Sequence, residues 1–134
     1  MKDQIITKKI LNWYDLNKRS LPWRKNVSLH NRQYYTLVSE FMLQQTQVAT
    51  VIPYFYRFIK KIPSLKHLAK VNNQKLIKLW EGLGYYSRVR NLKKTAQTII
   101  KDYNGKVPNN YEELLLLPGI GKYTASAILA ITFL

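Results

Sequence analysis

Glu40 is the acidic residue whose surroundings best suit catalysis. The chain has only seven acidic residues, and Glu40 lies inside an apolar segment, Leu37-Val-Ser-Glu-Phe-Met-Leu43. A carboxyl group held among apolar side chains has its charged form disfavoured, so it can stay protonated near neutral pH and act as a general acid. A glutamate on the solvent face of a helix fits the same local sequence equally well.

Two further segments carry side chains suited to contacts with nucleic-acid bases. Gln44-Gln-Thr-Gln47 follows the apolar segment directly, and such polar side chains can bond base edges or fill the gap left by an extruded base. Gly82-Leu-Gly-Tyr-Tyr86 offers an aromatic wedge on a flexible turn, and Arg88 and Arg90 follow as phosphate-binding charge. A solvated helix end and core tyrosines beside a turn are the ordinary alternatives, and both stay open here.

A glycine-containing turn joins two apolar segments near the end of the chain. Pro118 cannot continue the first helix, and Gly119 and Gly121 allow backbone angles closed to other residues. We expect the turn to present the amides of Gly119–Lys122 at the start of the next helix, where an anion such as DNA phosphate is favoured. An ordinary two-helix hairpin uses the same turn residues, so Pro-Gly-Ile-Gly alone does not decide.

Composition indicates a folded domain, or a piece of one, with a polyanionic partner. The 134 residues are 46% hydrophobic, which excludes a disordered basic tail. Lys and Arg number 22 against seven Asp and Glu, and residues 57–101 hold twelve basic residues with Glu81 as the one acid. This excess favours nucleic acid over a solvated lysine face, a ribosomal protein or a membrane-surface protein. It says nothing of chemistry.

Several classes of protein and site are disfavoured. No apolar run is long enough to span a membrane, and the N-terminus lacks the apolar region of a signal peptide. The absence of cysteine excludes disulfides and thiolate metal sites within these residues and fits a reducing cytosol. We expect a cytoplasmic, nucleoid-associated protein. His30 and His67 lack partners at metal-ligand spacing, so no metal site is expected. Neither a Walker loop nor a G-x-S-x-G motif is present.

Hydrophobic periodicity predicts an all-α protein. The Gly82-Leu-Gly84 break and a capping box at Asn110 and Glu113 separate the later helices. The segment 124–134 is apolar almost all round, so it should be a buried helix, and we expect the chain to be the front part of a larger protein. The expected helices are 3–17, 34–45, 48–61, a short one to Lys70 capped by Ser64, another to Trp80 capped by Asn73, 85–103, the leucine run after Asn110, and 124–134.

Four motifs, in order and with matching spacing, closely resemble the adenine DNA glycosylases of the MutY family. They are Leu21-Pro-Trp-Arg24, Ser39-Glu-Phe-Met-Leu-Gln-Gln-Thr-Gln-Val-Ala-Thr50, Gly82-Leu-Gly-Tyr-Tyr-Ser-Arg-Val-Arg-Asn91 and Leu117-Pro-Gly-Ile-Gly-Lys-Tyr-Thr-Ala125. The resemblance implies a helix-hairpin-helix DNA glycosylase fold, shortened at its C-terminal end. A six-helix barrel-like unit would cover about residues 25–128, with the helix-hairpin-helix at about 111–134 and the first helix packed from outside.

The resemblance also implies a role for individual residues. In this family a glutamate matching Glu40 protonates the flipped adenine. Adenine mispaired with 8-oxoguanine or guanine is removed from double-stranded DNA by hydrolysis of its N-glycosidic bond, and a monomer is expected. The remaining site residues implied are Arg24 and Tyr123 in the adenine pocket, Gln44 in the polar cluster that contacts DNA, Gln45 and Tyr85 wedged into the duplex, Thr46 and Leu83 beside 8-oxoguanine, and Gly119, Ile120, Gly121 and Lys122 on phosphate.

Several family features would lie beyond Leu134. These are the aspartate that stabilises the sugar cation, the four cysteines of a 4Fe-4S cluster and the C-terminal domain that helps recognise 8-oxoguanine. One charge-stabilising group of this kind is worth ~3–4 kcal/mol, so we expect residues 1–134 alone to be a weak or inactive enzyme. Tyr123 stands where bifunctional relatives carry a Schiff-base lysine, and Lys122 is one residue early, so strong lyase activity is not expected.

Two alternatives differ in substrate or in class. An endonuclease III-like glycosylase would act on oxidised pyrimidines, although Tyr123 in place of lysine argues against it. A non-catalytic helix-hairpin-helix remnant would bind DNA in a salt-sensitive way that is indifferent to Glu40→Gln.

Overall fold

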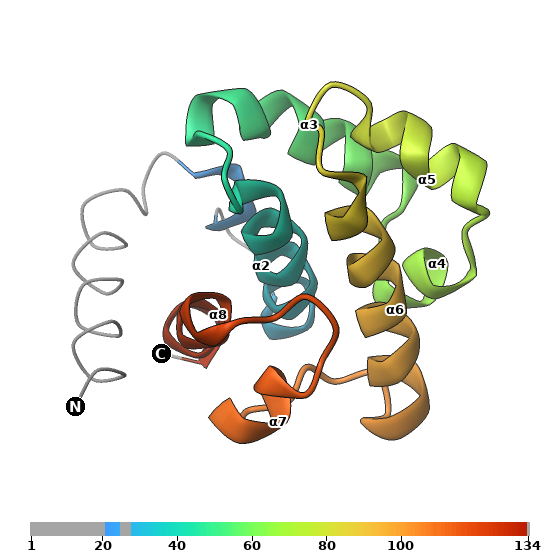
Figure 1. Cartoon of the computed structure of the whole chain (residues 1–134). Helices are drawn as coiled ribbons and strands as arrows, with labels where there is room; N and C mark the ends of the chain where they lie inside the picture. Colours follow the sequence, from blue (N-terminus) through green and yellow to red (C-terminus); the bar gives the residue numbers. More distant parts are fainter. Residues whose placement is uncertain (1–20, 25–27, 134) are drawn as a thin grey trace.

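The protein is built from helices throughout the part of the chain that the structure describes (Figure 1). The computed structural model describes residues 21–24 and 28–133, so the helix predicted at 3–17 lies outside the described residues. The all-α prediction is confirmed for the described residues. The elements are η1 (Pro22–Arg24), α2 (Leu29–Leu43), α3 (Val48–Lys61), α4 (Leu65–Lys70), α5 (Asn73–Trp80), α6 (Tyr86–Asp102), α7 (Tyr111–Leu115) and α8 (Lys122–Phe133).

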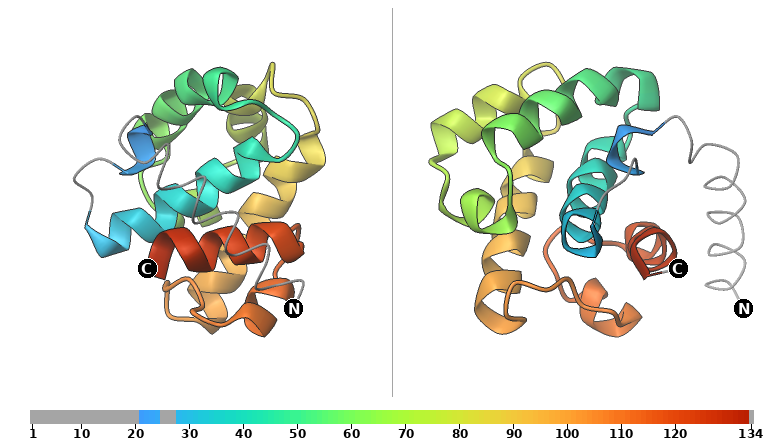
Figure 2. Two further views of the ribbon diagram at one scale, coloured as in Figure 1. Left: turned by 90° about the vertical axis from the view of Figure 1, so that its left-hand side faces the viewer. Right: turned by 180° about the vertical axis from the view of Figure 1, so that it is seen from behind.

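Helix α2 lies at the centre of the molecule. Its residues from Thr36 to Met42 are all buried, because η1, α3, α6 and α8 pack around it (Figures 1 and 2). At the edge of this core, Trp23 of η1 packs edge-on against Phe55 of α3, with ring centroids 5.1 Å apart. A polar residue on the inner half of α2 is therefore held in one place by rigid neighbours.

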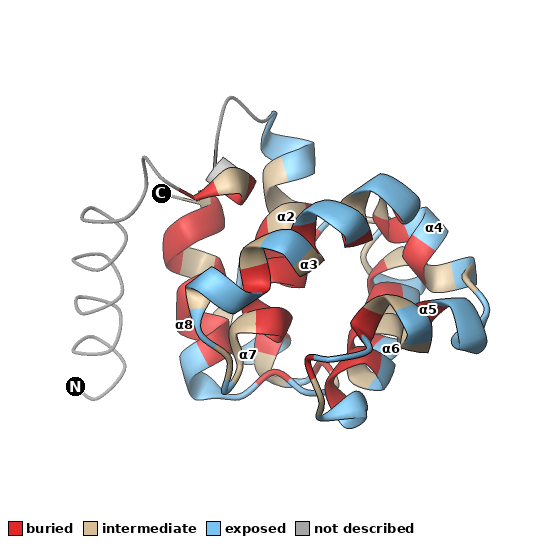
Figure 3. Cartoon of the chain, turned by 90° about the horizontal axis from the view of Figure 1, so that it is seen from above, coloured by how far each residue is buried: buried red, intermediate tan, exposed pale blue. Residues whose placement is uncertain are grey.

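Helix α8 is buried along most of its length, as its apolar sequence predicts (Figure 3). It packs against α2 and α7, and its inward positions are small or aliphatic, such as Ala125, Ala127 and Ile128. Small side chains let α8 approach α2 closely, which brings the start of α8 near the end of α2. Within residues 21–24 and 28–133, no helix combines the length and apolarity that a membrane crossing requires.

Two predicted helix starts are wrong, and the reason is capping. Helix α2 begins at Leu29 rather than Tyr34, because Ser28 caps it by accepting a hydrogen bond from the Asn31 amide at 3.2 Å. The polar stretch before Tyr34 is the exposed first part of this helix and not a loop. Helix α5 is capped by Asn72 and not Asn73. The caps predicted at Ser64 and Asn110 are confirmed.

Candidate functional site

Glu40 faces the interior and lines a cavity. The residue is 6% exposed, which resolves in favour of burial what the local sequence leaves open. The cavity measures about 230 Å³, and its walls come from the end of α2, the following loop 44–47 and the first turns of α8. Such a volume lies below the roughly 300–1,000 Å³ of sites for drug-sized ligands, so it suits one small heterocycle.

Tyr123, in the first turn of α8, lines the same cavity as Glu40 of α2. Partial burial raises the pKa of its phenol above the usual value of 10, and Glu40, when it is ionised, adds to the rise. Although Tyr123 lines this cavity together with Glu40, 64% of Tyr123 remains exposed. The phenol therefore stays protonated at neutral pH and can donate a hydrogen bond. The structure brings these two predicted pocket residues together.

Gln44 connects the end of α2 to the glycine turn. Its amide nitrogen Nε2 lies 3.2 Å from the Gly119 carbonyl oxygen and 3.2 Å from Thr124 Oγ1. An amide nitrogen has two hydrogens to donate, so both are directed within the protein. The predicted DNA contact of Gln44 is left to its carbonyl oxygen and stays a prediction.

The turn from Pro118 to Lys122 is held from two sides. Thr95 of α6 donates a hydrogen bond to the Pro118 carbonyl oxygen at 2.8 Å. Gly119 has a φ of +78°, and a Cβ there would lie 2.8 Å from Asn91 Cβ and 3.0 Å from Phe41 Cε1. Only glycine suits this backbone angle and this close approach together.

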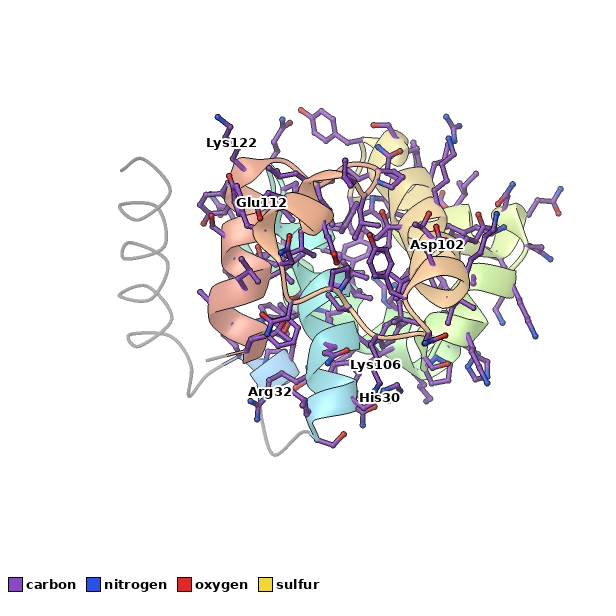
Figure 4. The ribbon with its side chains drawn as sticks, turned by 90° about the horizontal axis from the view of Figure 1, so that it is seen from below. His30, Arg32, Asp102, Lys106, Glu112 and Lys122 are labelled. Carbon is purple, nitrogen blue, oxygen red and sulfur yellow. The ribbon has the colours of Figure 1, made fainter. Side chains whose placement is uncertain are left out.

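The four residues predicted to bind phosphate do not share one role. Ile120 is 5% exposed, and its amide donates to the Leu117 carbonyl oxygen at 3.2 Å. The prediction that this amide faces an anion is therefore wrong, and Ile120 anchors the turn. Gly121 and Lys122 are exposed, with open space around Gly121 and the Lys122 side chain directed outward (Figure 4). The first amides of a helix lack intrahelical acceptors, so this end of α8 can still receive an anion.

Gln45 and Tyr85 are exposed residues at the tips of two neighbouring loops. Both have left-handed backbone angles, with φ of 63° for Gln45 and 51° for Tyr85. Such angles are uncommon for residues other than glycine and are concentrated at functional sites. The α2–α3 loop, the α5–α6 loop and the start of α8 lie along one edge of the molecule, on the right of the left-hand view in Figure 2.

The structure places two residues at the second loop and corrects the expectation for one of them. Leu83, predicted beside 8-oxoguanine, is 7% exposed and packs into the core, so its contact with DNA stays a prediction. Arg88 was expected to bind phosphate, which is wrong, because it is buried and donates hydrogen bonds inside the protein. A signal was present in the sequence, since Arg88 shares the helical face of Leu92 and Ile99, which are buried.

Two further predicted features concern Arg24 and an iron–sulfur cluster. Arg24 ends η1, and its side chain lies outside the described part of the chain. The chain's own residues also do not fit an iron–sulfur cluster, because the sequence has no cysteine and the described residues bring no group of three or more His, Cys, Asp or Glu together.

The helical fold, the glycine turn and the buried acid beside it define a class of DNA-repair domain. Residues 38–129 match the family model of the HhH-GPD superfamily base excision DNA repair protein, and the chain belongs to this family. The helix-hairpin-helix glycosylase fold implied by the sequence is confirmed. A solved structure of a thermostable thymine-DNA glycosylase is similar, with a TM-score of 0.76, 28% identity and coverage of 98% of this chain and 59% of that one.

Within that family, the chain is similar to adenine DNA glycosylases, as its motifs indicate. It is 50% identical over 129 residues to the one from Rattus norvegicus, which covers 92% of this chain and 25% of the relative. It is 48% identical over 125 residues to the one from Buchnera aphidicola subsp. Baizongia pistaciae, with 92% and 34% covered. The chain thus spans a quarter to a third of the length of these relatives.

Proposed function

We propose that this chain takes part in removing adenine from DNA, where the adenine is mispaired with 8-oxoguanine or guanine. The observation that carries the proposal is the buried carboxyl of Glu40 in a base-sized cavity next to the glycine turn. Similarity to adenine DNA glycosylases over 92% of the chain supports adenine as the base.

In this proposal Glu40 is the general acid. A base can reach the carboxyl only after leaving the duplex, because Glu40 lies inside the protein. Its carboxyl gives a proton to a ring nitrogen of adenine, and the bond between adenine and C1′ breaks with the electron pair leaving on the base. Water then adds to C1′ and releases one proton. The protonated phenol of Tyr123 stands where it can donate a hydrogen bond to the bound base.

The exposed edge would hold the DNA in place for this reaction. Gln45 and Tyr85 protrude from neighbouring loops and are suited to fill the space left by the extruded base. The start of α8 and Lys122 would bind a phosphate on the same edge. The positive sugar that forms during bond cleavage needs a second acid, and the proposal assigns none of the described residues to that role.

The decisive experiment compares Glu40→Gln with a matched control in the full chain. The substrates are duplexes containing A·8-oxoguanine, A·G or thymine glycol, and both base release and binding are measured. Because residues 1–134 are expected to release adenine only weakly, release is measured with protein in excess over DNA. Glu40→Gln removes the proton donor and keeps the shape, so release should fall to the rate without protein while binding stays within about twofold. Glu112→Gln, on the exposed first turn of α7, should change neither.

Other outcomes distinguish the rival functions. Release from thymine glycol but not adenine would identify an endonuclease III-like enzyme. Salt-sensitive binding without base release, unaffected by Glu40→Gln, would identify a DNA-binding module and overturn the proposal.

A further inference from the structure

Arg88 has an unusual position for a residue in a very basic chain. It is 7% exposed, although 22 residues of the chain are Lys or Arg and most described ones are exposed. Removing a guanidinium from water is costly unless hydrogen bonds replace the hydration. Burial lowers the pKa of Arg88 from its usual range, and nearby Tyr85 opposes that fall. The arginine stays charged at neutral pH, so its surroundings must compensate the loss of water.

The compensation comes from two loops that are far apart in sequence. On the first side, Nη1 directs its two hydrogens toward at least three acceptors, so at least one hydrogen is shared: the carbonyl oxygens of Met42 at 3.0 Å and of Gln44, and Thr46 Oγ1 at 3.2 Å. On the second side, Nη2 donates to the carbonyl oxygens of Leu83 at 3.1 Å and Gly84 at 3.2 Å. Each nitrogen of the guanidinium fork thus serves a different loop.

Aromatic rings complete the enclosure. The guanidinium carbon lies 5.6 Å from the centre of the Trp80 ring and 5.2 Å from that of Tyr85, both within range of a cation–π interaction. Trp80 is itself fixed by donating from its indole nitrogen to the Gly84 carbonyl oxygen at 3.1 Å. The arginine side chain therefore contacts the ring of Tyr85 directly, and it contacts the loop of Gln45 mainly through the backbone carbonyl groups of that loop.

The two loops are those with strained, exposed tips. Gln45 lies between the acceptor residues Gln44 and Thr46, and Tyr85 follows the acceptor Gly84. A left-handed backbone at a residue other than glycine persists only when its surroundings impose it. The hydrogen bonds of Arg88 flank both tips and supply that constraint.

From this arrangement we infer that Arg88 is a positioning residue that locks the Gln45 loop and the Tyr85 loop into one rigid, two-pronged wedge. Arginine is required because a planar fork can serve both loops at once, whereas the lysine ammonium is a single point of donation. The consequence for DNA distortion rests on the proposed function. The coupling of the two loops does not, because it is a property of the protein alone.

The coupling is tested by amide hydrogen exchange in the full chain without DNA. Arg88→Lys keeps the charge and loses the fork, so exchange should rise about tenfold or more in both segments, residues 44–47 and 83–87. Arg32→Lys makes the same chemical change at the opposite edge of the molecule (Figure 4) and should leave both segments unchanged. Faster exchange in one loop only, or in neither, would overturn the inference.

A second variant covers the case in which Arg88→Lys fails to fold. Thr46→Val removes one acceptor and leaves the arginine in the core. If the loops are coupled, exchange should increase several-fold in residues 83–87 as well as in 44–47. An effect confined to residues 44–47 contradicts the inference.

The wedge itself is tested with 2-aminopurine next to the target adenine, since its fluorescence rises when stacking is lost. We expect Arg88→Lys to reduce that rise at least about fivefold, with total binding at low salt within about twofold, and Arg32→Lys, at the edge opposite Lys122, to preserve the rise. A full rise in Arg88→Lys with both loops loosened would show that DNA distortion does not need a rigid wedge. No rise in the unmodified protein would instead refute the proposed function and leave the exchange result standing.

Discussion

Tyr34 and Tyr85 show how position decides what a tyrosine does in this chain. Tyr34 is 2% exposed, and its hydroxyl donates to the Ile62 carbonyl oxygen, which ties α2 to the end of α3. Tyr85 is 61% exposed and held in a left-handed conformation at a loop tip. The first stabilises the scaffold, and the second costs conformational energy that the scaffold must supply.

The buried hydroxyl predicts a loss of stability at high pH. Burial, with a smaller effect of Tyr35, raises the pKa of Tyr34 far above its usual value of 10. Above about pH 10 the unfolded chain releases this proton and the folded chain keeps it, so the free energy of unfolding falls as pH rises, by up to ~1.4 kcal/mol per pH unit. Denaturant unfolding of Tyr34→Phe should show a shallower alkaline slope.

At neutral pH the same variant loses stability. The Ile62 carbonyl oxygen is left without its hydroxyl donor, so Tyr34→Phe should lower the free energy of unfolding by about 1–2 kcal/mol. Tyr56→Phe, at a half-exposed position, is the matched control and should change neither the slope nor the neutral stability. Equal alkaline slopes in all three proteins would show that Tyr34 ionises in the folded state.

At the scale of elements, the glycine turn is a clamp between helices and not a free loop. Thr95 of α6 and Gln44, just after α2, donate hydrogen bonds to carbonyl groups of the turn, and Gly119 rests against both helices. The position of α8, and with it one wall of the cavity, therefore depends on this contact. Gly119 and Gly121 differ in how strictly the structure requires glycine at each position.

Substituting each glycine with alanine measures how far the stability of the protein depends on glycine at that position. Gly119→Ala meets a left-handed backbone angle and two contacts at or below 3.0 Å, so it should destabilise the protein by about 2–4 kcal/mol. Gly121→Ala meets open space and should change stability by less than about 1 kcal/mol. Thermal or denaturant unfolding measures both. Similar losses for the two variants would contradict the clamp.

The parts of the fold that can be predicted from the sequence are those that local interactions determine. Helices α3 and α4 were predicted within a residue of their bounds, because apolar spacing and local caps determine them. The start of α2 was predicted too late, because the polar residues after Ser28 have the composition of a loop although they form the exposed first turns of the helix. The burial of Glu40 depends on α8. The hydrogen bonds from Arg88 to Met42 and Gln44 span 46 and 44 residues, so no local pattern encodes either the cavity or this link between loops.

At the scale of the whole molecule, positive charge covers more than the edge proposed to bind DNA. Basic side chains occur on both sides, so the net charge of +15 does not by itself locate a binding face. Figure 4 shows Lys122 at one edge of the molecule and Lys106, with His30 and Arg32, at the opposite edge. Both lysines are exposed, so they form a matched pair of equal charge and different position.

The salt dependence of DNA binding tests which of these edges makes contact. Each phosphate neutralised by a lysine contributes about 0.9 to the slope of log affinity against log salt concentration. If the DNA lies across the two loops and the start of α8, Lys122→Gln should lower that slope by about one, and Lys106→Gln should leave it unchanged. The affinity of Lys122→Gln should fall similarly for matched and mismatched duplexes, because phosphate contacts carry no sequence information. A slope reduced equally by both substitutions would mean that the net charge of the chain, and not one edge, attracts DNA.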